Sequence, residues 1–205
     1  MPPPCLRGAV HHAPAAGGSL EAVSTQYYVA QSLDGYIAEA DHTLDWLLSY
    51  DGDAGADVSQ ATDGGYDRFY EQVGAVAMGS ATYEFILAES GWPYAGIPSW
   101  VFTSRELAVP EGADVRFANG PVAPLHDEMT AAAGQRNLWV VGGGNLVSQF
   151  ADEGLLDELL VTIVPVWLGD GMPTFAKRLE GKPLRLIGTH PFKNGMTELR
   201  YEFVR

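Results

Sequence analysis

The stretch V-V-G-G-G-N-L, Val140 to Leu146, combines residue types that suit the binding of a phosphate group. Glycine has no Cβ, so a bound group can approach the main chain closely. The following residues, Asn145–Glu153, are amphipathic and predict a helix, whose unpaired first-turn N–H groups favour an anion. Asn145 is placed to cap this helix. The sequence therefore predicts a strand, a glycine turn and a helix that together form a phosphate site.

Neither familiar nucleotide-binding motif is present in this stretch. The dinucleotide fingerprint G-x-G-x-x-G requires a third glycine where Val147 stands, and a Walker A motif requires G-K-[ST]. A tight turn without a ligand explains the three glycines as well as a phosphate site does. Both interpretations remain open on this segment alone.

Three other predicted strand ends carry glycine or hydrogen-bond donors. The segment M-G-S-A-T-Y-E holds Gly79 together with the hydroxyl groups of Ser80 and Thr82. The segment T-S-R ends in Arg105, whose guanidinium can bind a phosphate through two hydrogen bonds, and L-G-D-G-M-P follows the longest predicted strand. Ligands of open α/β sheets bind outside the carboxyl ends of the strands. Together these ends predict an extended ligand with more than one phosphate.

Apolar runs that alternate with helix-like stretches predict a three-layer α/β domain with a mostly parallel central sheet. The last run, T-E-L-R-Y-E-F-V, alternates polar with apolar residues, which predicts an antiparallel edge strand with one solvated face. Gly154 is placed to end the last helix. The predicted strands are Gln26–Ala30, Ala75–Met78, Ser99–Thr103, Asp114–Phe117, Asn137–Val141, Leu159–Trp167 and Thr197–Val204, and the predicted helices are Gly65–Gln72, Tyr83–Ala88, His126–Ala133 and Asn145–Glu153.

The 205 residues, 46% of them hydrophobic, suffice for one substantial core, so we expect a single domain. Residues 1–24 are rich in Pro, Gly and Ala, a composition that does not repay the entropy cost of ordering. We therefore predict a disordered tail and a domain that starts at Thr25. The acidic, glycine-rich stretch Asp51–Gly65 lacks the glutamate that closes a calcium loop, so we expect a surface loop without a metal.

Charge and cysteine content exclude several kinds of partner. With 26 acidic and 12 basic residues the formal charge is −14, which disfavours nucleic acids and anionic membrane surfaces. The single cysteine, Cys5, excludes an intramolecular disulfide, and the five histidines lack the spacing of zinc ligands. No apolar run is long enough to span a bilayer, and the N-terminus lacks a signal-like segment. We expect a cytoplasmic protein that acts on a small molecule.

The chain resembles the reductase family that includes dihydrofolate reductase and, more closely, the C-terminal reductase domain of the bacterial riboflavin-biosynthesis deaminase-reductase. The matching segments follow the family's order along most of the chain. They are S-L-D-G-Y-I-A (Ser32–Ala38), L-D-W-L (Leu44–Leu47), M-G-S-A-T-Y-E (Met78–Glu84), T-S-R (Thr103–Arg105), V-V-G-G-G-N-L (Val140–Leu146) and V-P-V-W-L-G-D-G-M-P-T-F (Val164–Phe175).

This resemblance implies a dihydrofolate reductase-like fold with NADPH, or alternatively NADH, lying across the carboxyl edge of the sheet. The residues implied at the pyrophosphate are Gly142, Gly143, Gly144, Asn145 and Leu146, with Gly79, Ser80 and Thr82 from the neighbouring turn. Those implied at the adenosine 2′-phosphate are Thr103, Ser104 and Arg105, with Gly169 and Asp170 near the cofactor side of the cleft. Those implied beside the nicotinamide and substrate are Asp34, Gly35 and Trp46.

Two departures from the family pattern bear on cofactor and substrate. Family members commonly carry a basic residue directly after the glycine of M-G-x-x-T-Y, where this chain has Ser80 and Ala81. Dihydrofolate reductases also keep a carboxylate on the helix before that strand, whereas Asp63 and Asp67 are both slightly out of register. We therefore expect a small pterin-like or ribosylaminopyrimidine-like heterocycle, or a carbonyl compound, in preference to folate.

Hydride transfer depends on positioning more than on reactive side chains. If a proton accompanies the hydride, its source is Asp34, Asp67 or water, and Asp34 needs a raised pKa to donate near neutral pH. The alternative for Asp34 is a turn aspartate before Gly35, and the alternative for Trp46 is core packing.

These inferences converge on an NAD(P)H-dependent oxidoreductase with a place in riboflavin biosynthesis. One rival hypothesis is a non-catalytic nucleotide-binding or sensor module that keeps the same fold, and another is a protein that binds no nucleotide. The family resemblance also implies a homodimer, formed through the sheet edge or the Leu159–Trp167 strand.

Overall fold

The computed structural model describes residues 23–50, 65–176, 181 and 183–205. Residues 1–22 of the predicted tail, with Cys5, and residues 51–64 of the predicted acidic loop lie outside this part. The strands are β1 (Thr25–Ser32), β2 (Tyr36–Ala38), β3 (Val73–Gly79), β4 (Ser99–Phe102), β5 (Val115–Ala118), β6 (Asn137–Gly142), β7 (Glu158–Val164), β8 (Met172–Pro173), β9 (Leu184–Pro191) and β10 (Thr197–Phe203). The helices are α1 (Asp45–Leu48), α2 (Tyr66–Glu71), α3 (Ser80–Ser90), α4 (Ala123–Ala133) and α5 (Gly144–Asp152).

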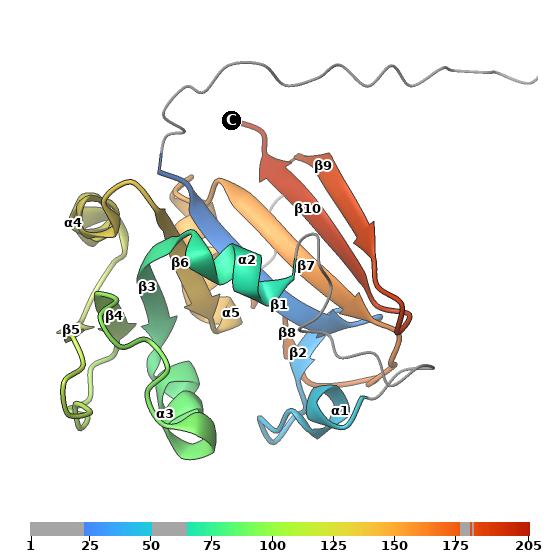
Figure 1. The fold of residues 1–205 in the computed structure, drawn as a ribbon, viewed down its shortest axis with the longest axis horizontal. Coiled ribbons are helices and arrows are strands. Elements are labelled where there is room, and N and C mark those ends of the chain that lie inside the picture. Colours follow the sequence, from blue (N-terminus) through green and yellow to red (C-terminus); the bar gives the residue numbers. More distant parts are fainter. Residues whose placement is uncertain (1–22, 51–64, 177–180, 182) are drawn as a thin grey trace, which may run out of the picture.

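Eight of these strands form one sheet in the order β5-β4-β3-β6-β1-β7-β10-β9 (Figure 1). The six strands from β5 to β7 pair in parallel, while β10 is antiparallel to β7 and β9 is antiparallel to β10. Strands β2 and β8 form a separate two-stranded sheet. Because β3, β6, β1 and β7 are parallel, their carboxyl ends meet at one edge of the sheet, which we call the carboxyl edge.

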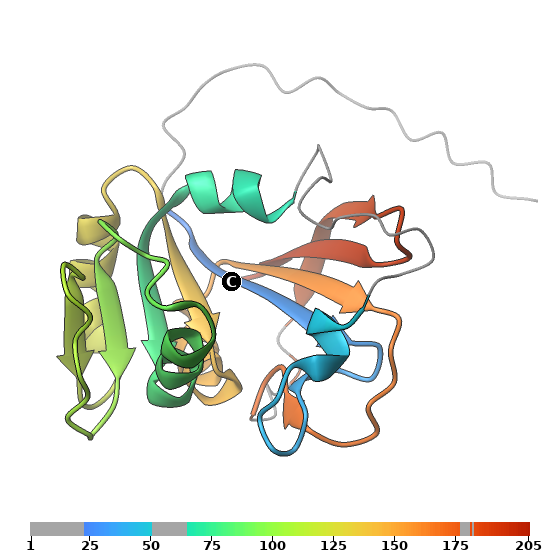
Figure 2. The same cartoon turned by 60° about the horizontal axis from the view of Figure 1, so that its bottom comes forward.

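Helices cover both faces of the sheet, so the domain has three layers. On one face, which we call the α5 face, α4 and α5 pack over a buried cluster that includes Tyr27, Leu138 and Phe150. On the other, the α2 face, α2 and α3 pack over a cluster that includes Tyr28 and Trp139. Helix α2 crosses in front of the sheet in Figure 1 and lies above it in Figure 2. The three-layer, mostly parallel architecture predicted from the sequence is confirmed.

The sheet ends in an antiparallel edge strand, as predicted, but that strand is β9 and not the predicted Thr197–Val204 strand. Strand β10 is antiparallel, as its alternating sequence indicates, but it is not the edge strand, because β9 pairs with its outer side. Every residue of β9 is exposed or half-buried, so its sequence L-R-L-I-G-T-H-P lacks the buried alternation that marks a strand. The predicted solvated face of β10 is confirmed at Arg200 and Glu202, which are exposed and half-buried, but not at Glu198, which is only 8% exposed.

Several element boundaries follow from local chemistry. Strand β7 ends at Val164 and not at Trp167 as predicted, because the next residue, Pro165, has no N–H to donate to a strand ladder. Helices α3, α4 and α5 begin earlier than predicted, and Gly143 is the N-cap of α5. The prediction that Asn145 caps this helix is wrong, because Asn145 lies inside its first turn and no side-chain cap bond is made. The prediction for Gly154 is confirmed, since its φ of +69° follows the C-cap.

Candidate functional site

Two helices begin side by side at the carboxyl edge. Strand β3 leads through Gly79 into α3, and the neighbouring strand β6 leads through Gly143 into α5. The two caps are close, since a Cβ placed on Gly79 would lie 3.8 Å from the backbone nitrogen of Gly143. Both N-caps are glycines, so neither residue has a side chain that could cap the first-turn N–H groups of its helix. First-turn N–H groups of two helices therefore converge on one place, an arrangement that favours an anion.

The three consecutive glycines after β6 serve different purposes. Gly142 has φ +146°, a conformation that only glycine adopts readily. Gly144 is needed for packing, because a Cβ there would lie 2.7 Å from the carbonyl oxygen of Pro173. Gly143 has neither constraint: its φ is −82°, and a Cβ would meet only the Thr82 hydroxyl oxygen, at 3.8 Å.

Gly79, like Gly143, is not required to be glycine by its backbone conformation or by its packing. Its φ is −82°, and the nearest atoms to a built Cβ lie at 3.8 and 3.9 Å, both in the backbone of the glycine turn. Contacts inside the described part of the protein therefore do not require glycine at either cap. Two unconstrained glycines that face each other at paired helix starts form a cradle that a Cβ would fill. This geometry fits the diphosphate of a dinucleotide, which needs a close approach to main-chain N–H groups.

Arg105 lies beside this cradle but is already paired. Its guanidinium makes two hydrogen bonds with the Glu84 carboxylate of α3, at 3.0 and 2.5 Å. The hydrogen bonds and the negative charge of Glu84 raise the pKa of Arg105. The backbone N–H of Arg105 donates to the hydroxyl oxygen of Thr103, and Ser104 is exposed. A phosphate at this position therefore has to compete with a carboxylate for the arginine.

Asp34 binds the protein's own backbone. Its carboxylate accepts hydrogen bonds from the N–H groups of Gly169, at 2.7 Å, and Leu168, at 3.2 Å, and from the Ser32 hydroxyl at 2.7 Å. Burial acts to raise the pKa of Asp34, but these hydrogen bonds together outweigh it and lower the pKa below its ordinary value. That is opposite to the shift a proton donor near neutral pH requires. The geometry instead matches the turn aspartate that the sequence left as the alternative.

In the glycine turn after β7, backbone N–H groups already donate hydrogen bonds to carboxylates of the protein. The Gly169 N–H points to Asp34, and the Gly171 N–H donates to the Asp170 carboxylate at 2.8 Å. Gly171 is required because its φ is +147° and a Cβ would lie 2.2 Å from the carbonyl oxygen of Ala38. Gly35 is likewise a turn residue, with φ +89°. Packing and turn geometry explain these residues without a ligand.

Three other residues singled out from the sequence have structural surroundings. Trp46 of α1 is 7% exposed and packs against Val164 and Phe192, which matches core packing. Leu146 is buried in the core of the α5 face, so its side chain does not face the cradle. Asp67, on α2, is exposed.

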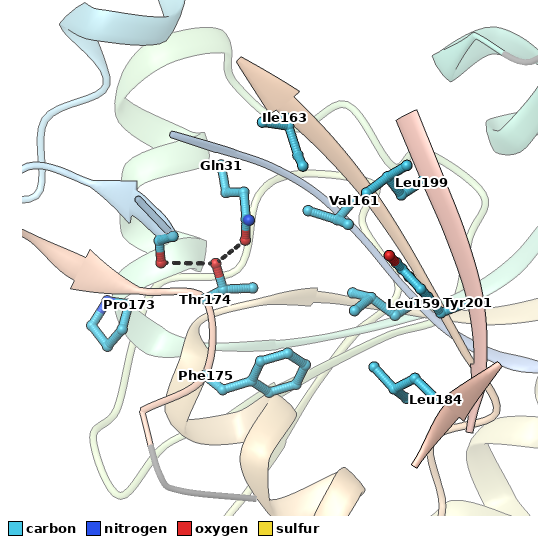
Figure 3. Close-up of a pocket in the computed structure, with 11 residues that line it drawn as sticks. Gln31, Leu159, Val161, Ile163, Pro173, Thr174, Phe175, Leu184, Leu199 and Tyr201 are labelled. Atoms are coloured by element: carbon cyan, nitrogen blue, oxygen red, sulfur yellow. Dashed lines mark hydrogen bonds between the residues drawn. The ribbon is translucent and has the colours of Figure 1, made fainter. Parts of the chain in front are cut away.

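A cavity of about 510 Å³ lies on the α5 face, and two of its lining residues, Pro173 and Thr174, pack against Gly144 of the glycine turn (Figure 3). Its floor consists of apolar side chains from β7 and β10, and Leu184 of β9 borders it. At one end the Thr174 hydroxyl lies within hydrogen-bond distance of the Gln31 side-chain oxygen, at 2.5 Å, and of the Gly35 carbonyl, at 3.0 Å. Gly35, which the resemblance implies beside the substrate, lines this cavity. The rest of the lining comes from five separate elements, so no local sequence pattern pointed to the cavity as a whole.

Thr162 and Glu198 are buried polar residues that the sequence did not single out. They lie side by side on the α2 face, where β7 pairs with β10. The alternation in β10 assigns Glu198 to a solvated face, and only the packing of the whole sheet reveals its burial.

Among the described residues no group of three or more His, Cys, Asp and Glu side chains could hold a metal ion. No helix in that part of the chain has the length and apolar character needed to cross a membrane.

Comparison with known proteins places these features in a family. The model of the RibD C-terminal domain family matches residues 92–197. The uncharacterized protein YwjB of Bacillus subtilis is 34% identical over 169 residues, which are 82% of this chain and 91% of that protein. A Shewanella sp. PV-4 protein assigned to riboflavin biosynthesis superposes with TM-score 0.74 at 27% identity, covering 89% of this chain and 100% of that one. Enterococcus faecalis dihydrofolate reductase, solved with NADP(H), shares the fold at TM-score 0.59 and 17% identity, over 89% of this chain and 97% of that one.

Proposed function

The chain belongs to the RibD C-terminal domain family, a reductase-type family, and on that premise we propose that it is an NADPH-dependent oxidoreductase of a small heterocyclic or carbonyl substrate. The observation that carries this proposal is the cradle at the carboxyl edge. Gly79 and Gly143 face each other there, and neither is required to be glycine by contacts among the described residues.

In this proposal the cradle binds the diphosphate of the cofactor. The first-turn N–H groups of α3 and α5 donate hydrogen bonds, and the positive ends of both helices offset the unfavourable net charge of the protein. The hydroxyl of Thr82, beside the glycine turn, is a further donor, and Ser80 and Asn145 lie in the two first turns. When bound, NADPH supplies a hydride to the substrate, and the protein contributes orientation and exclusion of water.

The choice between NADPH and NADH depends on Arg105 in this proposal. An arginine recognises a phosphate through two parallel N–H groups, and Arg105 presents such a pair to Glu84. Binding of the 2′-phosphate then requires the guanidinium to leave Glu84 or to share its donors. The exposed Ser104 and Thr103 precede it in the same loop. We expect NADPH to be preferred only modestly, because the carboxylate remains close to the phosphate.

The apolar cavity suggests a second copy of this chain as a partner, as the family resemblance also implies. By register, Leu184 and Leu186 of β9 lie on the same face as the cavity floor, and Leu186 is 51% exposed. An open apolar surface next to an unpaired edge strand is a liability unless it is covered. A symmetric pair would cover both copies at once. Sedimentation should therefore show a dimer, and Leu186→Arg should shift it toward the monomer.

Two measurements test the reductase proposal. Titration of the full chain with NADPH should show saturable binding, and NADPH oxidation should follow when pterins, ribosylaminopyrimidines, flavins or quinones are added. The absence of NADPH and NADH binding would reject it. The competing hypothesis of a non-catalytic nucleotide-binding module is favoured by Ser80 and Ala81, where family members carry a basic residue. That hypothesis predicts an equal thermal shift with nucleotides that lack the nicotinamide, and no oxidation with any compound.

A further inference from the structure

Residues 172–176, which we call the β8 segment, lie between strand β1 and the start of α5. The regular pairing of this segment is short, because β8 has only two residues. One of them, Pro173, has no N–H to donate to the neighbouring strand β2. Contacts outside the strand pairing therefore have to hold the β8 segment in place.

On one side the β8 segment touches the glycine turn of the cradle. A Cβ placed on Gly144 would lie 2.7 Å from the carbonyl oxygen of Pro173 and 3.2 Å from that of Thr174. The N–H group of Ala176 donates to the carbonyl oxygen of Gly144 at 3.4 Å. Gly144 is the first residue of α5, directly after the N-cap Gly143. The β8 segment therefore supports the first turn of α5 at this point.

On the other side the β8 segment is bound to β1 and to the turn that follows it. The hydroxyl of Tyr27, a fully buried residue, donates to the carbonyl oxygen of Thr174 at 3.4 Å, and the Thr174 N–H donates to the Gly35 carbonyl oxygen at 3.1 Å. The Thr174 hydroxyl lies 2.5 Å from the Gln31 side-chain oxygen and 3.0 Å from the Gly35 oxygen, as the dashed lines in Figure 3 show. Thr174 thus binds this part of the protein through both its main chain and its side chain.

The groups that face the Thr174 hydroxyl are themselves held by the fold. Gln31 belongs to β1, which pairs in parallel with β6 and β7. Gly35 follows Asp34, whose carboxylate accepts a hydrogen bond from the Gly169 N–H at 2.7 Å. Thr174 is only 7% exposed, so water has little access to replace the hydrogen bonds of its hydroxyl. The hydroxyl therefore joins the β8 segment to a well-supported part of the sheet.

We propose that Thr174 is a positioning residue for the cofactor cradle. Its hydroxyl holds the β8 segment against β1, and the segment in turn holds Gly144, so that the first-turn N–H groups of α5 stay directed at the cofactor diphosphate. This inference rests on the proposed function, and Thr174 acts through Gly144 without touching the cofactor. Donors that are already in place bind an anion without a further loss of conformational entropy, so a looser first turn should bind it more weakly.

Calorimetric titration of NADPH into the full chain and its Thr174 variants tests the proposal. Valine keeps the branched shape of threonine without the hydroxyl, whereas serine keeps the hydroxyl. Thr174→Val should bind NADPH about fivefold more weakly than wild type, and Thr174→Ser should stay within about twofold of wild type. The matched control is Thr189→Val on β9, where Thr189 is exposed, and it should leave the affinity unchanged.

A second variant keeps the test valid if Thr174→Val does not fold. Gln31→Leu removes one of the two oxygens that face the Thr174 hydroxyl and leaves the other, the Gly35 carbonyl, in place. It should weaken NADPH binding by a smaller factor than Thr174→Val, about twofold to threefold.

Hydrogen exchange without nucleotide separates positioning of α5 from a general loss of stability. The N–H groups of Leu146 and Val147 both donate to the Gly143 carbonyl and report on the start of this helix. Thr174→Val should speed their exchange relative to the N–H groups of α4, whereas a general loss of stability would speed both alike.

Two results would overturn the assignment of Thr174. One is equal NADPH affinity of wild type and Thr174→Val, and the other is unchanged exchange at the start of α5 in that variant. If wild type does not bind NADPH but exchange at the start of α5 speeds up as expected, the proposed function is rejected while the support of α5 by Thr174 stands.

Discussion

The glycine turns after β6 and after β7 look alike in sequence but differ in what contacts them. After β7, the N–H groups of Leu168 and Gly169 donate to Asp34, and Gly171 packs against the backbone of Ala38. After β6, the N-cap of α5 is Gly143, which has no side chain with which to cap the helix. One turn is already bound to the protein's own carboxylate, whereas among the described residues no carboxylate binds the helix start at the other.

This difference shows what marks a binding site in a glycine-rich turn. Glycine content alone does not distinguish the two turns, because each contains at least one residue with a positive φ. What distinguishes them is whether contacts within the protein account for each glycine and each N–H group. Gly143 and Gly79 are the residues that such contacts leave unexplained.

The largest effect is expected at Gly144. A Cβ at this position would lie 2.7 Å from a backbone oxygen of Pro173, which cannot move without shifting the segment around β8. Gly144→Ala should therefore lower the free energy of unfolding by about 1–3 kcal/mol, as measured by urea denaturation. An unchanged midpoint would remove the packing explanation for this glycine and weaken the contrast with Gly143.

Arg105 tests how far the cofactor site extends from the cradle. Arg105→Ala should weaken NADPH binding about tenfold and NADH binding much less, because only NADPH carries the extra phosphate. Glu84→Gln, which frees the guanidinium, should strengthen NADPH binding by a smaller factor. Parallel titrations of both cofactors provide the measurement, and equal losses for the two in Arg105→Ala would reject this assignment.

The smallest effect is expected at Asp34. Its pKa is lowered below the ordinary 3.8, so the stability that its ionised form contributes is present above that value and is lost as the pH falls through the lowered pKa. Asp34→Asn should melt slightly below wild type at pH 7, and the gap should close under more acidic conditions. The carboxylate is accessible to solvent, which screens its contribution. NADPH affinity should stay within twofold of wild type, and a large loss would mean that this turn does bind the cofactor.

The sequence predicted the architecture and the location of the cradle better than the roles of single residues. Strand, turn and helix at Val140–Asp152 follow from local periodicity, which is why that unit was found. The distinct purposes of Gly142, Gly143 and Gly144 depend on Thr82 and Pro173, which are distant in sequence. The contact of Asp34 with Gly169 was missed for a similar reason, because the two residues lie more than 130 positions apart in the sequence. Glu198 was assigned to a solvated face because alternation reports two faces of a strand but not what covers them.

Gly143 provides the most direct test of the central claim that the helix starts after β3 and β6 bind the cofactor diphosphate. NADPH should be titrated into wild-type protein and Gly143→Ala, with thermal unfolding of both as the control for folding. The account predicts saturable binding by wild type, binding at least about tenfold weaker by the variant, and the same unfolding temperature without nucleotide. Equal NADPH affinity in the two proteins, or no binding by wild type, would contradict it.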